Sequence, residues 1–138
     1  MKHILPSIFL TLSACAMSHG PVRYVPPEEA AWFKLPQEFP QKGQETLSGT
    51  LAVAIQLAME DFIPWHASLP PGASSTEICR LQRQAYDVET APLGEEVMLV
   101  RIFTSPGACH LELPTDTGMG ATYAVDTRNW RILAMRRP

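Results

Sequence analysis

The chain has 138 residues, which is enough for one domain with a single hydrophobic core. Its composition is globular, with 46% hydrophobic and 18% charged residues, while its 13 prolines exceed the usual share of about 5% and indicate a segment without regular structure. The formal net charge is −3 and the only basic cluster lies at the C-terminus, so the sequence argues against nucleic-acid binding (Arg128, Arg131, Arg136 and Arg137).

The beginning of the chain has the architecture of an export signal. A basic start is followed by an apolar stretch from Ile4 to Leu12 and then by two small residues. The apolar stretch is far shorter than the ~20 residues that a permanent membrane helix needs, and Pro6 weakens it further. We therefore expect residues 1–14 to be a signal peptide.

The four residues Leu12-Ser13-Ala14-Cys15 resemble the lipobox of bacterial lipoproteins at every position. In that family the cysteine thiol receives a diacylglycerol, the leader is removed before the cysteine, and a third acyl chain is added to the new amine. The resemblance implies that Cys15 is the lipidation site, with palmitate-type chains that hold the protein on a membrane. Several acyl chains anchor stably where a single chain binds only marginally.

The residue after the cysteine refines the expected location. Ala16 differs from the aspartate that keeps such lipoproteins in the inner membrane, so the resemblance favours the outer membrane with the protein facing the periplasm. An ordinary secretory leader, cleaved near Ala14 or Ala16 to release a soluble protein, is the alternative. The resemblance covers only the leader and implies nothing about the rest of the chain.

Residues 15–45 are expected to be the lipidated N-terminus and a proline-rich tether. Prolines break any regular hydrogen bonding in this stretch, which reads as a linker several nanometres long when extended (Pro21, Pro26, Pro27, Pro36 and Pro40). It also contains four large apolar residues, for which we favour docking onto the domain over docking onto a partner (Trp32, Phe33, Leu35 and Phe39).

Residues 46–138 are expected to form the folded domain, beginning with a helix from about Thr46 to Ile63. Apolar residues recur there at intervals of three or four and mark one helical face (Leu47, Leu51, Ile55, Met59 and Phe62). Thr46 or Ser48 can cap its start, and Pro64 disfavours helical geometry at Ile63. A loop rich in Pro, Gly and Ser is predicted from Ser68 to Thr76.

Short alternating runs in the second half of the chain predict four β-strands (Ala85–Thr90, Val97–Phe103, Ala121–Asp126 and Trp130–Met135). Arg101 marks one face of the second strand as partly exposed to water. Turns are predicted at Pro92-Leu93-Gly94 and at Asp126-Thr127-Arg128-Asn129. The predicted fold class is α+β, with one amphipathic helix packed on a four-stranded antiparallel sheet of two hairpins. The order of elements is similar to cystatin-like or nuclear-transport-factor-like (NTF2-like) folds, by analogy only.

Two cysteines, Cys79 and Cys109, flank the predicted turn at Leu93 at nearly equal distances along the chain. A hairpin that turns there brings them near each other at its open end. In an exported protein two cysteines so placed are expected to form a disulfide.

The sequence gives little support for a metal or cofactor site. His66, Cys79, Cys109 and His110 are zinc-ligating types, but their spacing is not that of a zinc motif. Adjacent Cys109 and His110 would point to opposite faces of a strand, and an oxidised Cys79 could not ligate. The same reasons argue against a cysteine–histidine nucleophile pair. We expect no metal, no cofactor and no catalytic residue.

Acidic and glycine-rich stretches have simpler interpretations. The carboxylate pairs read as solvated acids (Glu60-Asp61, Glu95-Glu96, and Glu112 with Asp116). Gly118-Met119-Gly120 lacks the third glycine and the flanking elements of a phosphate loop, and it reads as a loop before the third strand.

The possible partner surface comprises Trp32, Phe33, Trp65 and Trp130, although Trp65 and Trp130 are favoured as core or sheet-covering residues. The expected function is non-catalytic: a membrane-anchored lipoprotein that binds a protein partner or serves the envelope, for instance as an immunity-type inhibitor of a toxin. The alternative is a small hydrolase or ligand carrier with a pocket between helix and sheet, lined by polar groups (His66, Tyr86, Asp87 or Tyr123).

Overall fold

A computed structural model of the chain describes residues 24–110 and 120–138. The expected signal peptide and Cys15 lie outside the described residues, as do Glu112, Asp116 and Gly118-Met119. None of the helices in the described part is long and apolar enough to cross a membrane.

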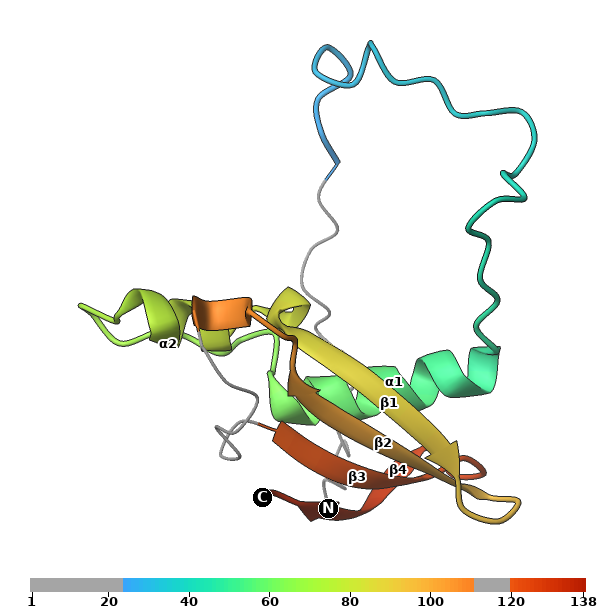
Figure 1. The fold of residues 1–138 in the computed structure, drawn as a ribbon, viewed down its shortest axis with the longest axis vertical. Coiled ribbons are helices and arrows are strands. Elements are labelled where there is room, and N and C mark those ends of the chain that lie inside the picture. Colours follow the sequence, from blue (N-terminus) through green and yellow to red (C-terminus); the bar gives the residue numbers. More distant parts are fainter. Residues whose placement is uncertain (1–23, 111–119) are drawn as a thin grey trace, which may run out of the picture.

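The domain is built on a four-stranded antiparallel sheet in the order β1-β2-β3-β4, so each strand pairs with the next along the chain (Figure 1). The strands are Tyr86–Pro92 (β1), Val97–Thr104 (β2), Gly120–Asp126 (β3) and Arg131–Arg136 (β4). The predicted α+β class, with four strands near the expected positions, is confirmed. The two predicted hairpins join through β2 and β3 into one continuous meander.

The β1–β2 and β3–β4 turns form where the sequence predicts them. Gly94 has a φ of +73°, a left-handed conformation that glycine adopts without steric cost, and it follows Leu93, whose N–H donates to the Val97 carbonyl over 2.8 Å. In the second turn the Asp126 carboxylate accepts hydrogen bonds from the N–H groups of Arg128 and Asn129, each at 3.0 Å. This side-chain capping of a turn is what aspartate commonly does.

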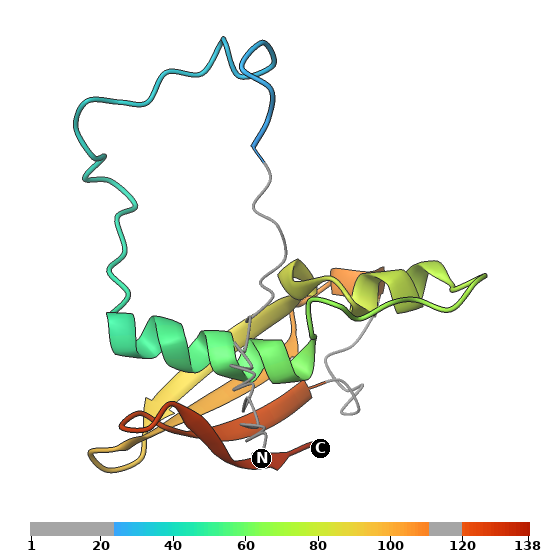
Figure 2. The same ribbon diagram turned by 180° about the vertical axis from the view of Figure 1, so that it is seen from behind.

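Helix α1, Gly49–Phe62, covers one face of the sheet (Figures 1 and 2). It begins after Ser48, whose Oγ accepts a hydrogen bond from the Leu51 N–H at 3.2 Å, and it ends before Ile63, where Pro64 follows. Ser48, one of the two residues predicted as the cap, is the capping residue, so the helix begins later than the predicted start at about Thr46. Leu47 therefore precedes the helix and is exposed instead of contributing to its apolar face.

The core lies between α1 and the sheet. Ala54 and Ala58 are fully buried at the centre of the helix face, where their small side chains allow the helix backbone to approach the strands closely. They pack in one cluster with residues of the two central strands (Val100, Ile102, Ala121, Tyr123 and Val125). The predicted apolar stripe is therefore present, but its buried centre lies on the alanines.

A second helix, α2 (Ser75–Arg80), overlaps the end of the stretch predicted as a loop. Ser74 and Glu77 form a reciprocal capping box: the Glu77 carboxylate accepts from the Ser74 N–H at 2.7 Å, and Ser74 Oγ accepts from the Glu77 N–H at 3.3 Å. The Ser74 hydroxyl also donates to the Glu77 carboxylate at 2.8 Å, and the hydrogen bonds that this carboxylate accepts from the Ser74 backbone and hydroxyl lower the pKa of Glu77. The Ser-x-x-Glu pattern was a sequence signal for this helix.

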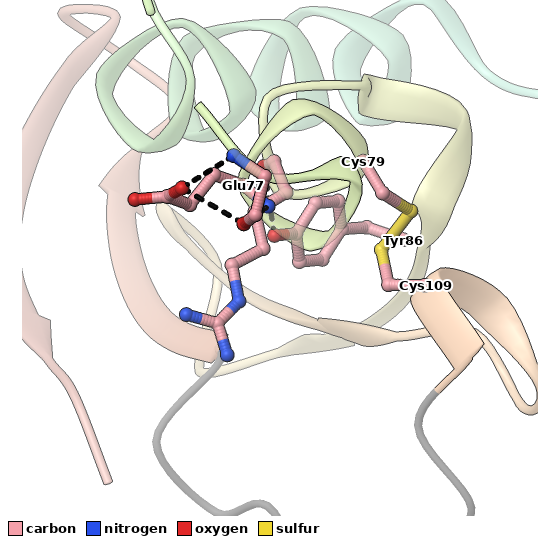
Figure 3. Close-up of a disulfide and its surroundings, with 6 residues drawn as sticks. Glu77, Cys79, Tyr86 and Cys109 are labelled. Atoms are coloured by element: carbon pink, nitrogen blue, oxygen red, sulfur yellow. Dashed lines mark hydrogen bonds between the residues drawn. A yellow bond between two sulfur atoms is a disulfide. The ribbon is translucent and has the colours of Figure 1, made fainter. Parts of the chain in front are cut away.

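A disulfide between Cys79 and Cys109 joins α2 to a short 3₁₀ turn, η2 (Ala108–His110), as predicted (Figure 3). The two Cα atoms are 5.4 Å apart. Tyr86 at the start of β1 supports this region, because its hydroxyl donates to the Arg80 carbonyl at 2.9 Å while its ring makes an edge contact with Phe62. Cys109 has a φ of +57° inside η2 and is not part of a strand, so the argument that Cys109 and His110 point to opposite strand faces was wrong.

The tether departs from expectation. Figure 1 shows residues 24–48 as an extended loop that lies away from the domain and meets it at the start of α1. Trp32 is 82% exposed and makes an edge contact with the neighbouring Phe33, whose ring centroid is 5.8 Å away. Leu35 and Phe39 are also exposed. The expectation that these side chains dock onto the domain was wrong for this structure.

Candidate binding surface

The face of the sheet opposite α1, here called the open face, is covered by no other helix or strand of residues 24–110 and 120–138 (Figures 1 and 2). Successive side chains of a strand point to opposite faces, so the residues that alternate with the core residues belong to the open face. On β2, for example, Val100 and Ile102 are buried against α1, whereas Leu99 and Arg101 lie on the open face.

An apolar row crosses the open face from edge to edge. The strand register places Ala91, Leu99, Ala124 and Ala134 opposite one another on the four strands. Leu99 is the only large side chain of this row and it is half-buried. A β-bulge in β4 follows Ile132 and adds Leu133, which is 51% exposed. The row therefore places a strip of apolar groups on the open face.

A polar row lies directly beside the apolar one. Glu89, Arg101, Thr122 and Arg136 face one another across the four strands. Arg101 and Glu89 form an ion pair whose side chains are 62% and 53% exposed, so solvent weakens its contribution to stability. The row places a negative charge on the β1 edge and a positive charge on the β4 edge.

The end of the open face next to the β3–β4 turn is held rigid by Asp126. Besides the two backbone N–H groups of the turn, its carboxylate accepts from Asn129 Nδ2 at 3.0 Å and from Arg131 Nε at 3.1 Å. These hydrogen bonds, from Asn129 above all, hold the pKa of Asp126 far below its usual range. Arg131 is thereby fixed at the β4 edge, where the Asp126 carboxylate balances its charge.

The four predicted partner-surface residues do not come together. Trp32 and Phe33 lie on the tether, and Trp65 follows the end of α1. Trp130 lies in the β3–β4 turn, and this turn and the end of α1 are at opposite ends of the domain (Figure 1). Trp65 is 55% exposed and Trp130 is 40% exposed, so the preference for core or sheet-covering positions was wrong for both. Trp130 has a φ of +53° and precedes β4, which begins one residue later than predicted.

Trp65 has a structural partner of its own. The Arg83 guanidinium carbon lies 3.7 Å from the centroid of the indole ring, a cation–π contact, and the same guanidinium donates to the Ile63 carbonyl at 2.7 Å. Burial lowers the pKa of Arg83, with Glu60 acting in the opposite sense. These contacts stabilise the chain where it leaves α1.

The polar residues proposed for a pocket between helix and sheet also separate. Tyr123 is fully buried and its hydroxyl donates to the Asp61 carboxylate at 3.0 Å. Tyr86 is occupied at Arg80 as described above, Asp87 accepts from Ser105 Oγ at 2.7 Å, and His66 is exposed. Among the residues that the structure describes, none of these four side chains is hydrogen-bonded to another of the four.

The structure also accounts for Gly120 and bears on the residues considered for a metal site. Gly120 is the first residue of β3, and a Cβ there would lie 2.6 Å from the Ile102 carbonyl oxygen, so the close approach of β2 and β3 accounts for this glycine. Within residues 24–110 and 120–138, no group of three or more His, Cys, Asp or Glu side chains is arranged to hold a metal ion.

Comparisons of the chain with models of protein families, with curated proteins and with solved structures find no match. The analogy with cystatin-like or nuclear-transport-factor-like folds thus rests on element order alone.

Proposed function

We propose that this chain is a membrane-anchored lipoprotein whose domain binds a protein through the open face. One observation carries the binding role: an apolar row with Leu99 at its centre lies next to a charged row on a sheet face that no described element covers. Burying a half-exposed leucine and its neighbours against a partner removes apolar surface from water, which is the main driving force for association.

The anchor is proposed from the sequence. Cys15 closes a lipobox-like motif, and the long exposed tether that follows fits a protein held at a distance from a bilayer. The acyl chains would fix the N-terminus in the outer membrane, and the tether would let the open face reach a partner in the periplasm.

The anchor is tested by metabolic labelling with a palmitate analogue in a bacterial host. The wild-type chain should incorporate label and appear in its cleaved form, whereas Cys15→Ala should lose the label and accumulate as uncleaved precursor. Cys79→Ala serves as the matched control, because it removes a cysteine outside the motif. Equal labelling of the wild type and Cys15→Ala would refute lipidation at this residue.

The binding role is tested by affinity capture from envelope extracts. Leu99→Glu places a charge in the centre of the apolar row and should abolish recovery of the bound protein. Leu93→Glu, in the exposed β1–β2 turn, introduces the same side chain away from the open face and should leave recovery unchanged. Equal recovery with both variants would rule out the open face as the binding surface.

A further inference from the structure

We propose that the occupant of the open face is a second copy of this chain, packed face to face about a two-fold axis that runs parallel to the strands between β2 and β3. This inference rests on the proposed binding role of the open face and names the partner. It follows from the distribution of charge and side-chain size across the four strands.

The charges of the open face have opposite signs at its two edges. Asp87 and Glu89 lie on β1 and Arg136 lies on β4, whereas the charge of Arg131 on β4 is balanced by Asp126. A surface with this arrangement cannot pair with itself when equivalent edges meet, because like charges would then face each other. It pairs with itself when the β1 edge of one copy meets the β4 edge of the other.

A two-fold axis parallel to the strands produces that arrangement. It reverses the strand order between the facing sheets and keeps each residue at its level along the strand. Because Glu89 and Arg136 belong to the same cross-strand row, Glu89 of one copy then faces Arg136 of the other, and the reciprocal pair forms at the opposite edge. A two-fold interface uses the same patch on both copies, so this one set of residues satisfies both sides.

The same axis also makes the apolar rows of the two copies complementary in side-chain size. It brings Leu99 on β2 over the short side chain of Ala124 on β3 of the second copy, and Ala91 over Ala134. Facing sheets lie about 10 Å apart, and a large residue opposite a small one fills such a gap without overlap. The two leucines would thus lie side by side across the axis in the centre of the interface.

The size of the face predicts a weak association. Four strands spaced about 4.8 Å apart, with about seven residues each at 3.4 Å, give about 450 Å² per copy, or about 900 Å² in total. Stable interfaces bury about 1,200–2,000 Å², so the dimer would form mainly where the copies are concentrated. Anchoring both chains on one membrane provides such a concentration.

Site-specific photo-crosslinking in intact cells tests the inference with the full-length chain. Two differently tagged copies are co-expressed, with a photo-reactive amino acid in place of Ala91, which lies exposed at the β1 edge of the open face. Irradiation should yield an adduct that carries both tags. The same probe at Val53, on the outer side of α1, is the matched control and should yield none.

Charge reversal then tests the geometry. Glu89→Arg alone and Arg136→Glu alone should each lower the two-tag adduct by about tenfold, because both symmetric pairs become repulsive. Co-expression of the two single variants should restore the adduct, since each reversed charge meets its complement on the other chain. Arg137→Glu, just beyond β4, and Glu45→Arg, on the tether, make the same changes off the face and should have no effect.

The outcomes separate this inference from the proposed function. Absence of a two-tag adduct in the wild type, or failure of the mixed variants to restore it while each remains protease-resistant, would overturn the dimer. If the probe at Ala91 instead joins the chain to a different protein, the dimer is overturned while the binding role of the open face stands.

Discussion

The buried hydroxyl of Tyr123 shows how one polar atom fits into an apolar core. The side chain is fully buried, and its only polar atom donates to Asp61, which lies on α1. A hydroxyl left without a partner in such a place would be costly. Burial, together with the hydrogen bond to Asp61, raises the pKa of Tyr123 well above its usual value of about 10. Tyr123 therefore keeps its proton in the folded state.

Replacing Tyr123 with phenylalanine should lower the free energy of unfolding by about 1 kcal/mol at pH 7, the usual net contribution of such a hydrogen bond. Urea unfolding monitored by circular dichroism measures it. Asp61→Asn keeps an acceptor for the hydroxyl and should be nearly neutral. If Tyr123→Phe lowered the free energy of unfolding by more than about 3 kcal/mol, the hydroxyl would contribute more than its single hydrogen bond to Asp61.

The same tyrosine predicts a dependence on alkaline pH. Because the folded pKa is above the unfolded one, its contribution to stability is fully present below about pH 10 and is lost as the pH rises further, when the unfolded chain ionises first. Tyr123→Phe should therefore show a smaller loss of stability between pH 9 and about 11 than the wild type. The loss that remains would reflect Tyr86, whose pKa is also raised by burial.

At the scale of elements, α1 packs through its smallest residues. Ala54 and Ala58 are buried while larger side chains such as Ile55 and Leu57 flank them. The periodicity of the sequence located the helix and its apolar side, because a spacing of three to four residues suffices for that. It did not reveal that the alanines mark the line of closest approach, which depends on the bulk of Tyr123 and the other side chains on the facing strands.

Ala58→Leu should lower the free energy of unfolding by about 1–3 kcal/mol, because additional methyl groups in a filled core force strain. Ala52→Leu adds the same groups on the exposed side of the helix and should change stability by less than about 0.5 kcal/mol. Thermal or urea unfolding of the two variants makes the comparison. Equal effects would contradict the packing described for α1.

Helix α2 is the element that the sequence patterns did not predict. It has only six residues and no buried side chain, so periodicity gave no signal, although the Ser74–Glu77 capping box was present in the sequence. What holds α2 in place is tertiary: the disulfide to η2 and the hydrogen bond from Tyr86. The cysteines were paired correctly because a hairpin between them brings their ends together.

Replacing Cys79 and Cys109 together with serine should lower the free energy of unfolding by about 3–4 kcal/mol, the chain-entropy estimate for a loop of this length. Urea unfolding with and without reductant measures it. The wild type should be destabilised by reductant and the double variant should not respond. A wild-type unfolding midpoint that reductant leaves unchanged would show that the two thiols are not bonded.

At the scale of the whole molecule, an exposed segment of residues 24–48 precedes a compact domain. Proline content predicted the segment, but the direction of its aromatic side chains could not be inferred from sequence. The large apolar side chains of the tether are exposed in this structure, and whether such residues dock on a domain depends on tertiary contacts that local patterns do not contain. The rows of the open face could not be predicted from the sequence either, because the strand register decides which residues align across the four strands.

Limited trypsin digestion should cleave first after Lys34 and Lys42, which lie exposed on the tether. A fragment that begins near Gly43 and retains the disulfide should persist much longer, because cleavage within a folded domain requires local unfolding. Mass spectrometry of the digest identifies the fragment. Early cleavage at Arg101, on the central strand β2, would instead show that the domain opens readily.

By itself the sequence determined the strands, the main helix, their order and the cysteine pair, because alternation, helical periodicity and turn residues act over a few neighbouring positions. It also supplied the lipobox-like motif, which remains a prediction. Only the tertiary structure decided which alanines lie against the sheet, where the tryptophans lie, and that Glu89 and Arg136 share one row of the open face. These features depend on the pairing of residues far apart in the chain, for which local patterns contain no information.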